Sequence, residues 1–275
     1  KQRAHHARRM EVYAGMVDAM DMHIGRLMDY LQSIGEYENT IFIFTSDNGA
    51  AGTPLISPTG QSVLDQWFNR VGYETDIDNL GERGSWVAIG PSNATIAASP
   101  LAFYKFHANE GGLRVPLVMS GPGITQQGEL TDEFVFVTDL APTILGLLDI
   151  DNHNGNWKGE AMEPIVGSDF SEYLHGSAQQ VHIASEPIGY ELGGSSALFK
   201  GDYKIVINRF EQNETEWHLY NIKVDPGEVN DLRAEQPQLF EEMLADYEVW
   251  AQANDVLPMP EGYNRGRAIF RGGFN

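Results

Sequence analysis

The 275-residue chain carries 39 Asp and Glu against 18 Lys and Arg, which gives a net charge of −21. Nucleic-acid binding needs clustered basic side chains, so this balance argues against a nucleic-acid partner. The apolar content of 42% is that of an ordinary globular protein, and no stretch approaches the roughly 18 apolar residues of a membrane span. Because a strongly acidic surface suits high salt, we expect a marine or otherwise salt-exposed source.

A long amphipathic helix is predicted over residues 11–34. Its apolar residues recur at spacings of four and three and form one face: Val12, Met16, Met20, Ile24, Leu27 and Leu31. Gly35 is a natural cap at the carboxyl end. We interpret this methionine-rich face as core packing rather than as a cofactor site, because Met fills irregular gaps between helices and sheets.

The next feature is an apolar run, 41–43, which predicts a buried parallel strand that reaches Thr45 and lies centrally in its sheet. It leads into Ser46-Asp47-Asn48-Gly49. A carboxylate and an amide oxygen at the carboxyl end of such a strand lie where open α/β sheets bind their ligands. Two adjacent oxygen ligands suit a hard cation such as Ca²⁺. By themselves, however, these residues are more typical of an Asn-Gly turn that ends a strand, and only the sequence that follows favours the metal site.

Residues 50–104 show no sustained periodicity and are punctuated by Gly and Pro. A loop of this length inside a compact domain is usually functional or contains short helices of its own.

A second motif begins at Lys105, five residues before Glu110-Gly111-Gly112, and continues through Arg114 and Pro116. A strand-like run, 117–119, follows it. Downstream of a strand that ends in Ser-Asp-Asn-Gly, this motif resembles the sulfatase family. The similarity is greatest to the bacterial arylsulfatase branch of the alkaline-phosphatase-like superfamily. Either motif alone is weak, whereas the two together are specific.

The resemblance covers nearly the whole chain, but only the second half of a sulfatase. It includes, besides the two motifs, Asp21, Ile24–Arg26, Lys200–Lys204, Leu219–Asn221 and Asp225–Glu228. It implies an α/β fold in which residues 1–180 form the C-terminal part of the catalytic α/β sandwich. Residues 181–275 would then form a small antiparallel-sheet and helix subdomain with an extended tail.

The sequence after residue 137 gives its own secondary-structure signals. Thr138 is a candidate N-cap for a helix with Pro142 in its first turn. Short β-like runs separated by turns predict an antiparallel sheet over 181–183, 197–199, 203–207 and 217–220. A final helix is predicted from Pro237, with one apolar face formed by Leu239, Phe240, Met243, Leu244, Tyr247 and Trp250.

The sulfatase resemblance implies roles for individual residues. Asp47 and Asn48 would be metal ligands, for Ca²⁺ ahead of Mg²⁺, and Lys105 would contact the sulfate and the bridging oxygen as a catalytic and substrate-binding residue. His107 is a further substrate-binding candidate, although a rim or structural role is the preferred interpretation. Glu110 and Arg114 would brace the loop through hydrogen bonds and an ion pair. Gly111 and Gly112 are expected to supply backbone angles closed to other residues.

The family's nucleophile is not found in this chain. Its signature is Cys or Ser followed by x-Pro-x-Arg, whose first residue becomes formylglycine. The chain has no Cys, and its nearest Ser-x-Pro string, Ser185–Pro187, lacks the Arg. We therefore expect an N-terminal half of the same protein as a partner. The isolated chain is expected to be inactive, a folded structural portion only.

The expected reaction of the complete protein is hydrolysis of a small-molecule or saccharide sulfate monoester. A phosphonate monoester or phosphodiester hydrolase of the same superfamily is the alternative, because the two chemistries share the metal site. An oligomer is compatible with the sequence, as are periplasmic, secreted and cytoplasmic locations.

Overall fold

The computed structural model describes residues 2–52, 70–74, 76–126, 128–209, 212 and 214–260. The chain divides into two units. The first comprises Lys1–Leu27, Ser46–Pro116 and Pro187–Asn275, and the second comprises Met28–Thr45 and Leu117–Glu186. Each unit contains residues from both sides of residue 180, so the division of the chain at that point stays a prediction.

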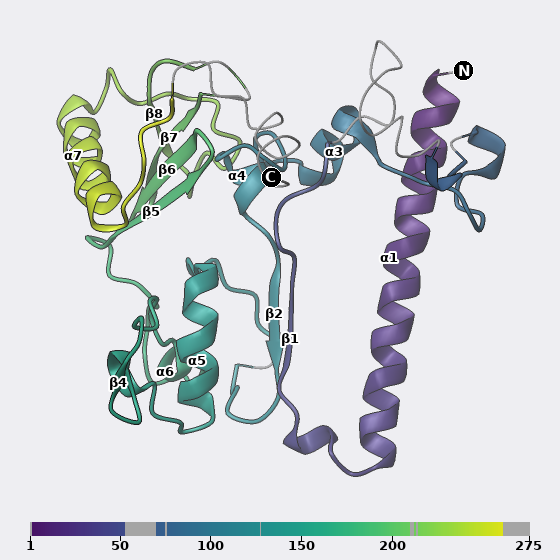
Figure 1. The fold of residues 1–275 in the computed structure, drawn as a ribbon, viewed down its shortest axis with the longest axis horizontal. Coiled ribbons are helices and arrows are strands. Elements are labelled where there is room, and N and C mark those ends of the chain that lie inside the picture. Colours follow the sequence, from purple (N-terminus) through teal and green to yellow (C-terminus); the bar gives the residue numbers. More distant parts are fainter. Residues whose placement is uncertain are drawn as a thin grey trace. The chain divides into compact units, whose positions relative to one another are not determined.

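A four-stranded antiparallel sheet covered by a helix forms the C-terminal part of the first unit (Figure 1). The strands are β5 (Pro187–Leu192), β6 (Ser195–Lys200), β7 (Tyr203–Asn208) and β8 (His218–Asn221), paired in that order. Helix α7 (Pro237–Ala253) packs its predicted apolar face on Leu198, Ile205 and Leu219. The predicted antiparallel sheet and final helix are therefore confirmed.

The predicted strand at 181–183 is wrong, because the first strand of this sheet is β5. In the second unit His182 instead lies between two carboxylates, with Nε2 2.8 Å from Asp139 and Nδ1 3.1 Å from Glu186. Burial alone would lower the pKa of His182, but hydrogen bonds to these carboxylates raise it above its ordinary value. Polar contacts rather than strand pairing fix this segment.

The first unit also contains shorter helices: a 3-10 helix (Ile77–Asn79), α3 (Gly90–Ala98) and α4 (Glu110–Leu113). The first two bear out the expectation of short helices between residues 50 and 104, of which 53–69 lie outside the described residues.

Helix α1 (Gln2–Ser33) begins earlier than predicted, and Gly35 follows it with a left-handed φ of 78° as expected of a cap. The prediction of core packing is wrong, since Met16 and Leu27 are 63% and 52% exposed. The amino-terminal half of α1 is held by polar contacts, including a hydrogen bond of 2.8 Å from Arg8 Nη2 to the Leu80 carbonyl. An apolar periodicity indicates which face favours burial, but it does not supply the surface that covers it.

In the second unit, β1 (Phe42–Thr45) pairs with β2 (Leu117–Ser120) in a two-stranded antiparallel sheet with Phe42 opposite Ser120. The expectation of a buried, central parallel strand is therefore wrong for the described residues: β1 has one neighbouring strand there, and Phe44 is 37% exposed. An apolar run predicts a strand, but the strand beside it decides whether the pairing is parallel. The other elements are 3-10 helices at Tyr37–Asn39, Val137–Asp139 and His153–Gly155, α5 (Leu140–Leu147), β3 (Asn156–Trp157), β4 (Glu160–Ala161) and α6 (Ser171–Leu174).

The prediction of Thr138 as the N-cap of α5 is wrong: Asp139 occupies that position, and its side chain makes no capping hydrogen bond to the helix. The Asp139 carboxylate instead accepts hydrogen bonds from the backbone N–H of Phe136 at 2.7 Å and of Ser168 at 2.8 Å. Asp139 is 1% exposed, so these bonds and His182 satisfy a buried carboxylate.

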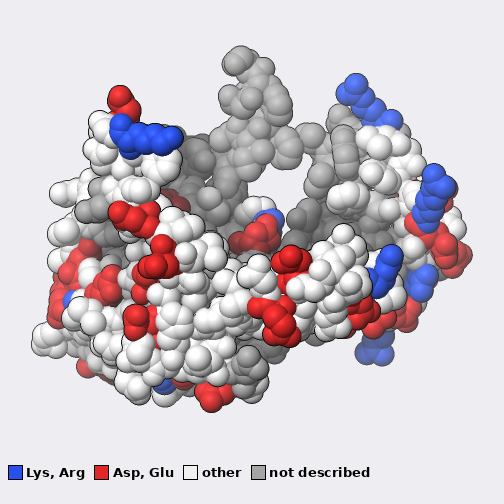
Figure 2. Space-filling model, turned by 90° about the horizontal axis from the view of Figure 1, so that it is seen from below, with Lys and Arg blue, Asp and Glu red and all other residues white. Residues whose placement is uncertain are grey.

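Carboxylates are spread over the face shown in Figure 2, in keeping with the net charge of −21. Among the described residues, no helix is both long enough and apolar enough to cross a membrane.

Candidate active site

The Asp47-Asn48 turn follows β1 directly and opens the central segment of the first unit. It is closed by local bonds: Ser46 Oγ donates to the Asn48 carbonyl at 2.9 Å, and Asn48 Nδ2 donates to the Gly49 carbonyl at 3.0 Å. With its amide nitrogen engaged, Asn48 offers its amide oxygen as a ligand atom. Asp47 is exposed and Asn48 is half-buried, so the turn presents oxygen atoms to solvent.

The loop that carries Lys105 lies directly against this turn. Lys105 N donates to the Ala50 carbonyl at 3.0 Å, and Gly49 N donates to the Gly112 carbonyl at 2.9 Å. The two motifs, far apart in sequence, are thus joined through their backbones. Lys105 is half-buried, with Nζ 5.4 Å from the ring centroid of Phe106, a cation–π contact that leaves the ammonium partly hydrated. Convergence of the Lys105, Asp47 and Asn48 side chains on one cleft stays a prediction.

Three glycines permit this close approach. A methyl group at Gly49 would overlap the Gly111 carbonyl, and one at Gly112 would overlap the His107 carbonyl. At Gly111 it would overlap the carbonyls of Ala102 and Phe103. None of the three has a positive φ. The expectation that Gly111 and Gly112 supply special backbone angles is therefore wrong: they are needed because backbones meet there without room for a side chain.

His107 is buried, with 3% exposure, and both ring nitrogens are occupied. Nδ1 lies 2.9 Å from the Tyr104 carbonyl and Nε2 lies 2.9 Å from Gln212 Nε2. The contacts match a neutral ring in which Nδ1 donates and Nε2 accepts. The ring also stacks on Phe103 at a centroid distance of 4.6 Å. This environment fits the structural role preferred for His107 rather than substrate binding.

A buried charge network lies beneath the Glu110-Gly-Gly segment. Lys204 Nζ, on β7, is 2.9 Å from Glu110 Oε1 and 3.1 Å from Glu228 Oε1, and Lys204 is 0% exposed. The second contact is an ion pair without hydrogen-bond geometry. Glu110 N also donates to Glu228 Oε2 at 2.7 Å. The expected Glu110–Arg114 ion pair is present at 3.8 Å, but the buried lysine is the nearer partner.

The charged groups in this network shift the pKa values of one another. Burial alone would lower the pKa of Lys204, but the two carboxylates raise it above its ordinary value. Burial raises the pKa of Glu228, and Lys204 opposes that shift only in part. One buried ammonium is shared by two carboxylates, so the network stays ionised only while its partners remain in place.

Sequence reasoning assigned no role to Lys204, Asn208 or Glu228. One signal was available, because Lys204 is the only charged residue in the strand Tyr-Lys-Ile-Val-Ile-Asn of β7. A lysine between apolar residues in a buried strand requires a carboxylate partner. The position of that partner, 94 residues earlier in the chain, is not visible in the sequence.

The donor set of the turn has the right chemistry for a hard cation but is incomplete. Ca²⁺ takes about six to eight oxygen ligands, and the side chains of Asp47 and Asn48 would supply two of them. No group of three or more His, Asp or Glu side chains among the described residues could hold a metal ion.

An α/β chain that joins an oxygen-rich turn to a lysine loop is a candidate hydrolase of anionic esters. The sulfatase family model matches residues 1–150, and the model for the C-terminal region of N-sulphoglucosamine sulphohydrolase matches 102–248. The chain belongs to the sulfatase family.

Two curated relatives illustrate the match. The chain is 34% identical to an uncharacterized sulfatase of Schizosaccharomyces pombe, over 94% of this chain and 46% of that protein. It is 33% identical to an arylsulfatase of Klebsiella aerogenes, over 62% of this chain and 36% of that protein. The chain thus spans about half the length of the first of these relatives and about a third of the second.

Solved structures show the same fold. The crystal structure of Ps i-CgsB in complex with k-i-k-neocarrahexaose matches with a TM-score of 0.61 and 22% identity, covering 94% of this chain and 46% of that one. The structure of BT4656 in complex with its substrate, D-glucosamine-2-N,6-O-disulfate, matches with a TM-score of 0.55 and 21% identity, covering 90% and 41%. These likenesses confirm the alkaline-phosphatase-like α/β fold.

Proposed function

We propose that this chain is the C-terminal portion of a Ca²⁺-dependent, formylglycine-type arylsulfatase that hydrolyses sulfate monoesters. The observation that carries the proposal is the pair of backbone bonds, Lys105 N to Ala50 O and Gly49 N to Gly112 O. These bonds join a candidate cation site to a candidate anion-contacting lysine. A sulfate ester needs both, because its oxygens are already negative and its leaving oxygen gains charge during cleavage.

Lys105 is proposed to contact the sulfate and the bridging oxygen. Its ammonium would stabilise the charge that develops as the S–O bond breaks, and its half-buried position would strengthen that interaction relative to bulk water. Asp47 and Asn48 would hold the cation against the sulfate oxygens. When present, formylglycine supplies the nucleophile of this chemistry; the chain contains no Cys, and its string Ser185–Pro187 lacks the Arg of the signature.

The remainder of the site is proposed to come from an N-terminal half of the same protein. Length supports this, since the chain covers 46% of its relative in Schizosaccharomyces pombe. The β1–β2 ribbon supports it too, because two strands alone are marginally stable in water and need further strands or helices to cover them. The missing half would supply the nucleophile, further metal ligands and neighbouring structure.

The proposal is tested by assaying the complete protein on an aryl sulfate, a saccharide sulfate and a phosphodiester, with and without Ca²⁺. We expect sulfate ester turnover that a chelator abolishes and added Ca²⁺ restores. Lys105→Ala should lower turnover about 100-fold or more, the scale of a lost transition-state contact, while Lys158→Ala, at an exposed site, should not. A preference for the phosphodiester would favour the alternative hydrolase.

The 275-residue chain alone should neither turn over sulfate esters nor bind Ca²⁺ tightly. Two protein ligands leave most of the coordination shell to water, so little is gained by transferring the cation from solvent. Robust turnover by the short chain would contradict the proposal.

A further inference from the structure

We propose that the C-terminal sheet positions Lys105, and that Ser195 on β6 and Asn208 on β7 are the positioning residues. Neither would touch substrate; both would act by holding the backbone that follows the lysine. The inference rests on the role proposed for Lys105 in sulfate ester hydrolysis.

The sheet and its loops contact each of the five residues that follow Lys105. The contacts, in chain order, are Ser195 Oγ to Phe106 O at 2.9 Å, Gln212 Nε2 to His107 Nε2 at 2.9 Å, Ala108 N to Asn208 Oδ1 at 2.7 Å, Asn208 Nδ2 to Asn109 Oδ1 at 2.8 Å, and Glu110 N to Glu228 Oε2 at 2.7 Å. A run of contacts without a gap fixes the path of the backbone rather than one point on it.

Phe106 shows why this backbone needs support. Its φ of 81° lies in the left-handed region, which is unfavourable for a bulky side chain and persists where the surroundings enforce it. Ser195 Oγ donates to the carbonyl of this same residue. Because Phe106 is the immediate neighbour of Lys105, release of that conformation would redirect the lysine.

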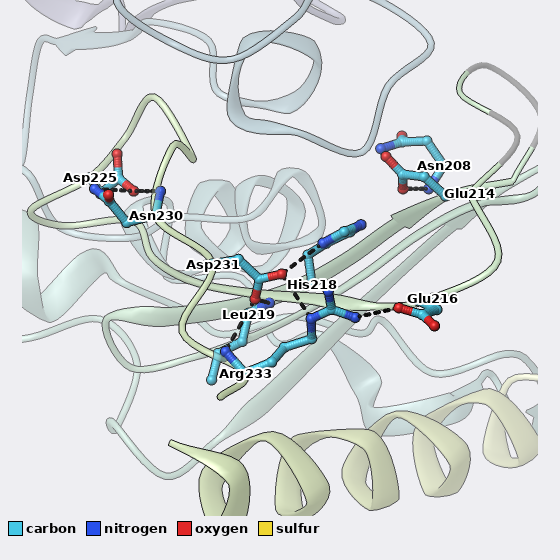
Figure 3. Close-up of polar contacts among 9 residues, drawn as sticks. All are labelled: Asn208, Glu214, Glu216, His218, Leu219, Asp225, Asn230, Asp231 and Arg233. Carbon is cyan, nitrogen blue, oxygen red and sulfur yellow. Dashed lines mark hydrogen bonds and ion pairs between the residues drawn. The ribbon is translucent and has the colours of Figure 1, made fainter. Parts of the chain in front are cut away.

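Asn208 is suited to hold the loop because it is itself fixed. It is 1% exposed, and its backbone N–H donates to Glu214 Oε2 at 2.6 Å (Figure 3). Its side-chain amide accepts a hydrogen bond from Ala108 N and donates one to Asn109 Oδ1, so one planar group fixes the positions of two adjacent residues. A buried amide that is bonded through both its oxygen and its nitrogen has one low-energy orientation.

The loop that carries Glu228 is also fixed. The carboxylate of Asp225 accepts from Val229 N at 3.0 Å and Asn230 N at 2.8 Å. Downstream, Asp231 accepts from His218 Nδ1 at 2.9 Å and Arg233 Nε at 2.7 Å (Figure 3). The loop that bonds Glu110 is therefore held by hydrogen bonds of its own, as Asn208 is.

On the other side, Lys105 N donates to Ala50 O, in the segment that follows the proposed metal ligands. The lysine is held between the turn and the sheet. A misplacement of about 1 Å in a catalytic group can cost about 100-fold in rate, so the sheet can affect turnover without entering the site.

The test uses the complete protein with Ser195→Ala and Asn208→Ala, and with Ser196→Ala as the matched control. Ser195 and Ser196 are adjacent on β6 and both are 0% exposed, but Ser196 Oγ bonds Glu191 instead of the loop. We expect Ser195→Ala and Asn208→Ala to lower kcat about 10-fold to 100-fold. Ser196→Ala should leave kcat within about twofold, with a similar loss of thermal stability.

A double-variant cycle with Lys105→Ala separates positioning from general destabilisation. If Ser195 and Asn208 act through Lys105, their substitution should cause no further loss of kcat in the Lys105→Ala background. Equal losses in both backgrounds, or equal losses for Ser195→Ala and Ser196→Ala, would overturn the inference. If Lys105→Ala itself leaves the rate unchanged, the proposed function fails first.

Discussion

Backbone hydrogen bonds join the lysine loop, residues 105–112, to the segment that follows the Asp47-Asn48 turn. The loop and the turn are nevertheless built differently. The loop is buried at His107, Asn109 and Glu110. Side chains of β6, β7 and the loops around them hydrogen-bond to it. The turn keeps Asp47 exposed, and the side chains of Ser46 and Asn48 each donate to a carbonyl within the turn. One half of the site is therefore fixed by this chain, and the other half is only presented by it.

This difference follows from what each half would bind. A lysine that stabilises the charge developing in the transition state benefits from a rigid support, because its side chain then needs no reorganisation during the reaction. A carboxylate that binds a cation can stay hydrated at little cost until the cation and the other ligands of that cation are present. We therefore expect substitutions beneath the loop to damage the fold and substitutions in the turn to spare it.

The largest effect is expected at Lys204. Lys204→Met would leave Glu110 and Glu228 buried around an apolar side chain, which should lower the free energy of unfolding by about 3–5 kcal/mol. Lys200→Met is the control: Lys200 also lies between two carboxylates, but Glu242 and Asp246 are 61% and 28% exposed. Water can solvate these carboxylates once the lysine is removed, so the cost should stay near or below about 1 kcal/mol. Denaturant unfolding of the complete protein measures both. Equal costs would contradict the distinction.

The contact between loop and turn can be broken at Gly49. A methyl group there would overlap the Gly111 carbonyl, so Gly49→Ala should destabilise the protein by about 1–3 kcal/mol as the backbones separate. Gly25→Ala, in helix α1 with open space around it, should instead stabilise by about 0.5–1 kcal/mol. Thermal unfolding of the two variants gives the comparison. A neutral Gly49→Ala would mean that the two motifs are not tightly joined.

Glu228 provides a pH test of the buried network. Glu228→Gln keeps an acceptor for Glu110 N and should cost about 1 kcal/mol, less than Lys204→Met. Burial raises the folded-state pKa of Glu228 above 4.5, so the native protein holds its proton more tightly than the unfolded chain does. The wild type should thus lose stability relative to Glu228→Gln as the pH rises from about 4.5 through that raised pKa. Parallel unfolding curves at all pH values would exclude a perturbed Glu228.

The smallest structural effect is expected in the turn. Asp47→Ala removes an exposed carboxylate and should change the free energy of unfolding by less than about 0.5 kcal/mol. In the complete protein the same change should abolish Ca²⁺-dependent turnover. Unfolding measured in the presence of a chelator, beside an activity assay, separates the two effects. A large loss of stability without Ca²⁺ would show that Asp47 is structural.

The sequence predicted what depends on local patterns. Helix α7 and strands β6, β7 and β8 followed from periodicity, and the two motifs from their spacing. It did not predict the pairing of β1 or the exposure of Met16, because these depend on which surfaces are present to pack against. Nor could it show Lys204 under Glu110, since an ion pair across 94 residues is set by tertiary structure.

The central claim is that the loop and the turn converge on one sulfate group. Its most direct test is a crystal structure of the complete protein with Ca²⁺ and a sulfate ester that is not turned over. We expect the cation on the oxygens of Asp47 and Asn48, with Lys105 Nζ within hydrogen-bonding distance of the same sulfate. A cation held elsewhere, or a Lys105 ammonium directed away from the bound sulfate, would contradict it.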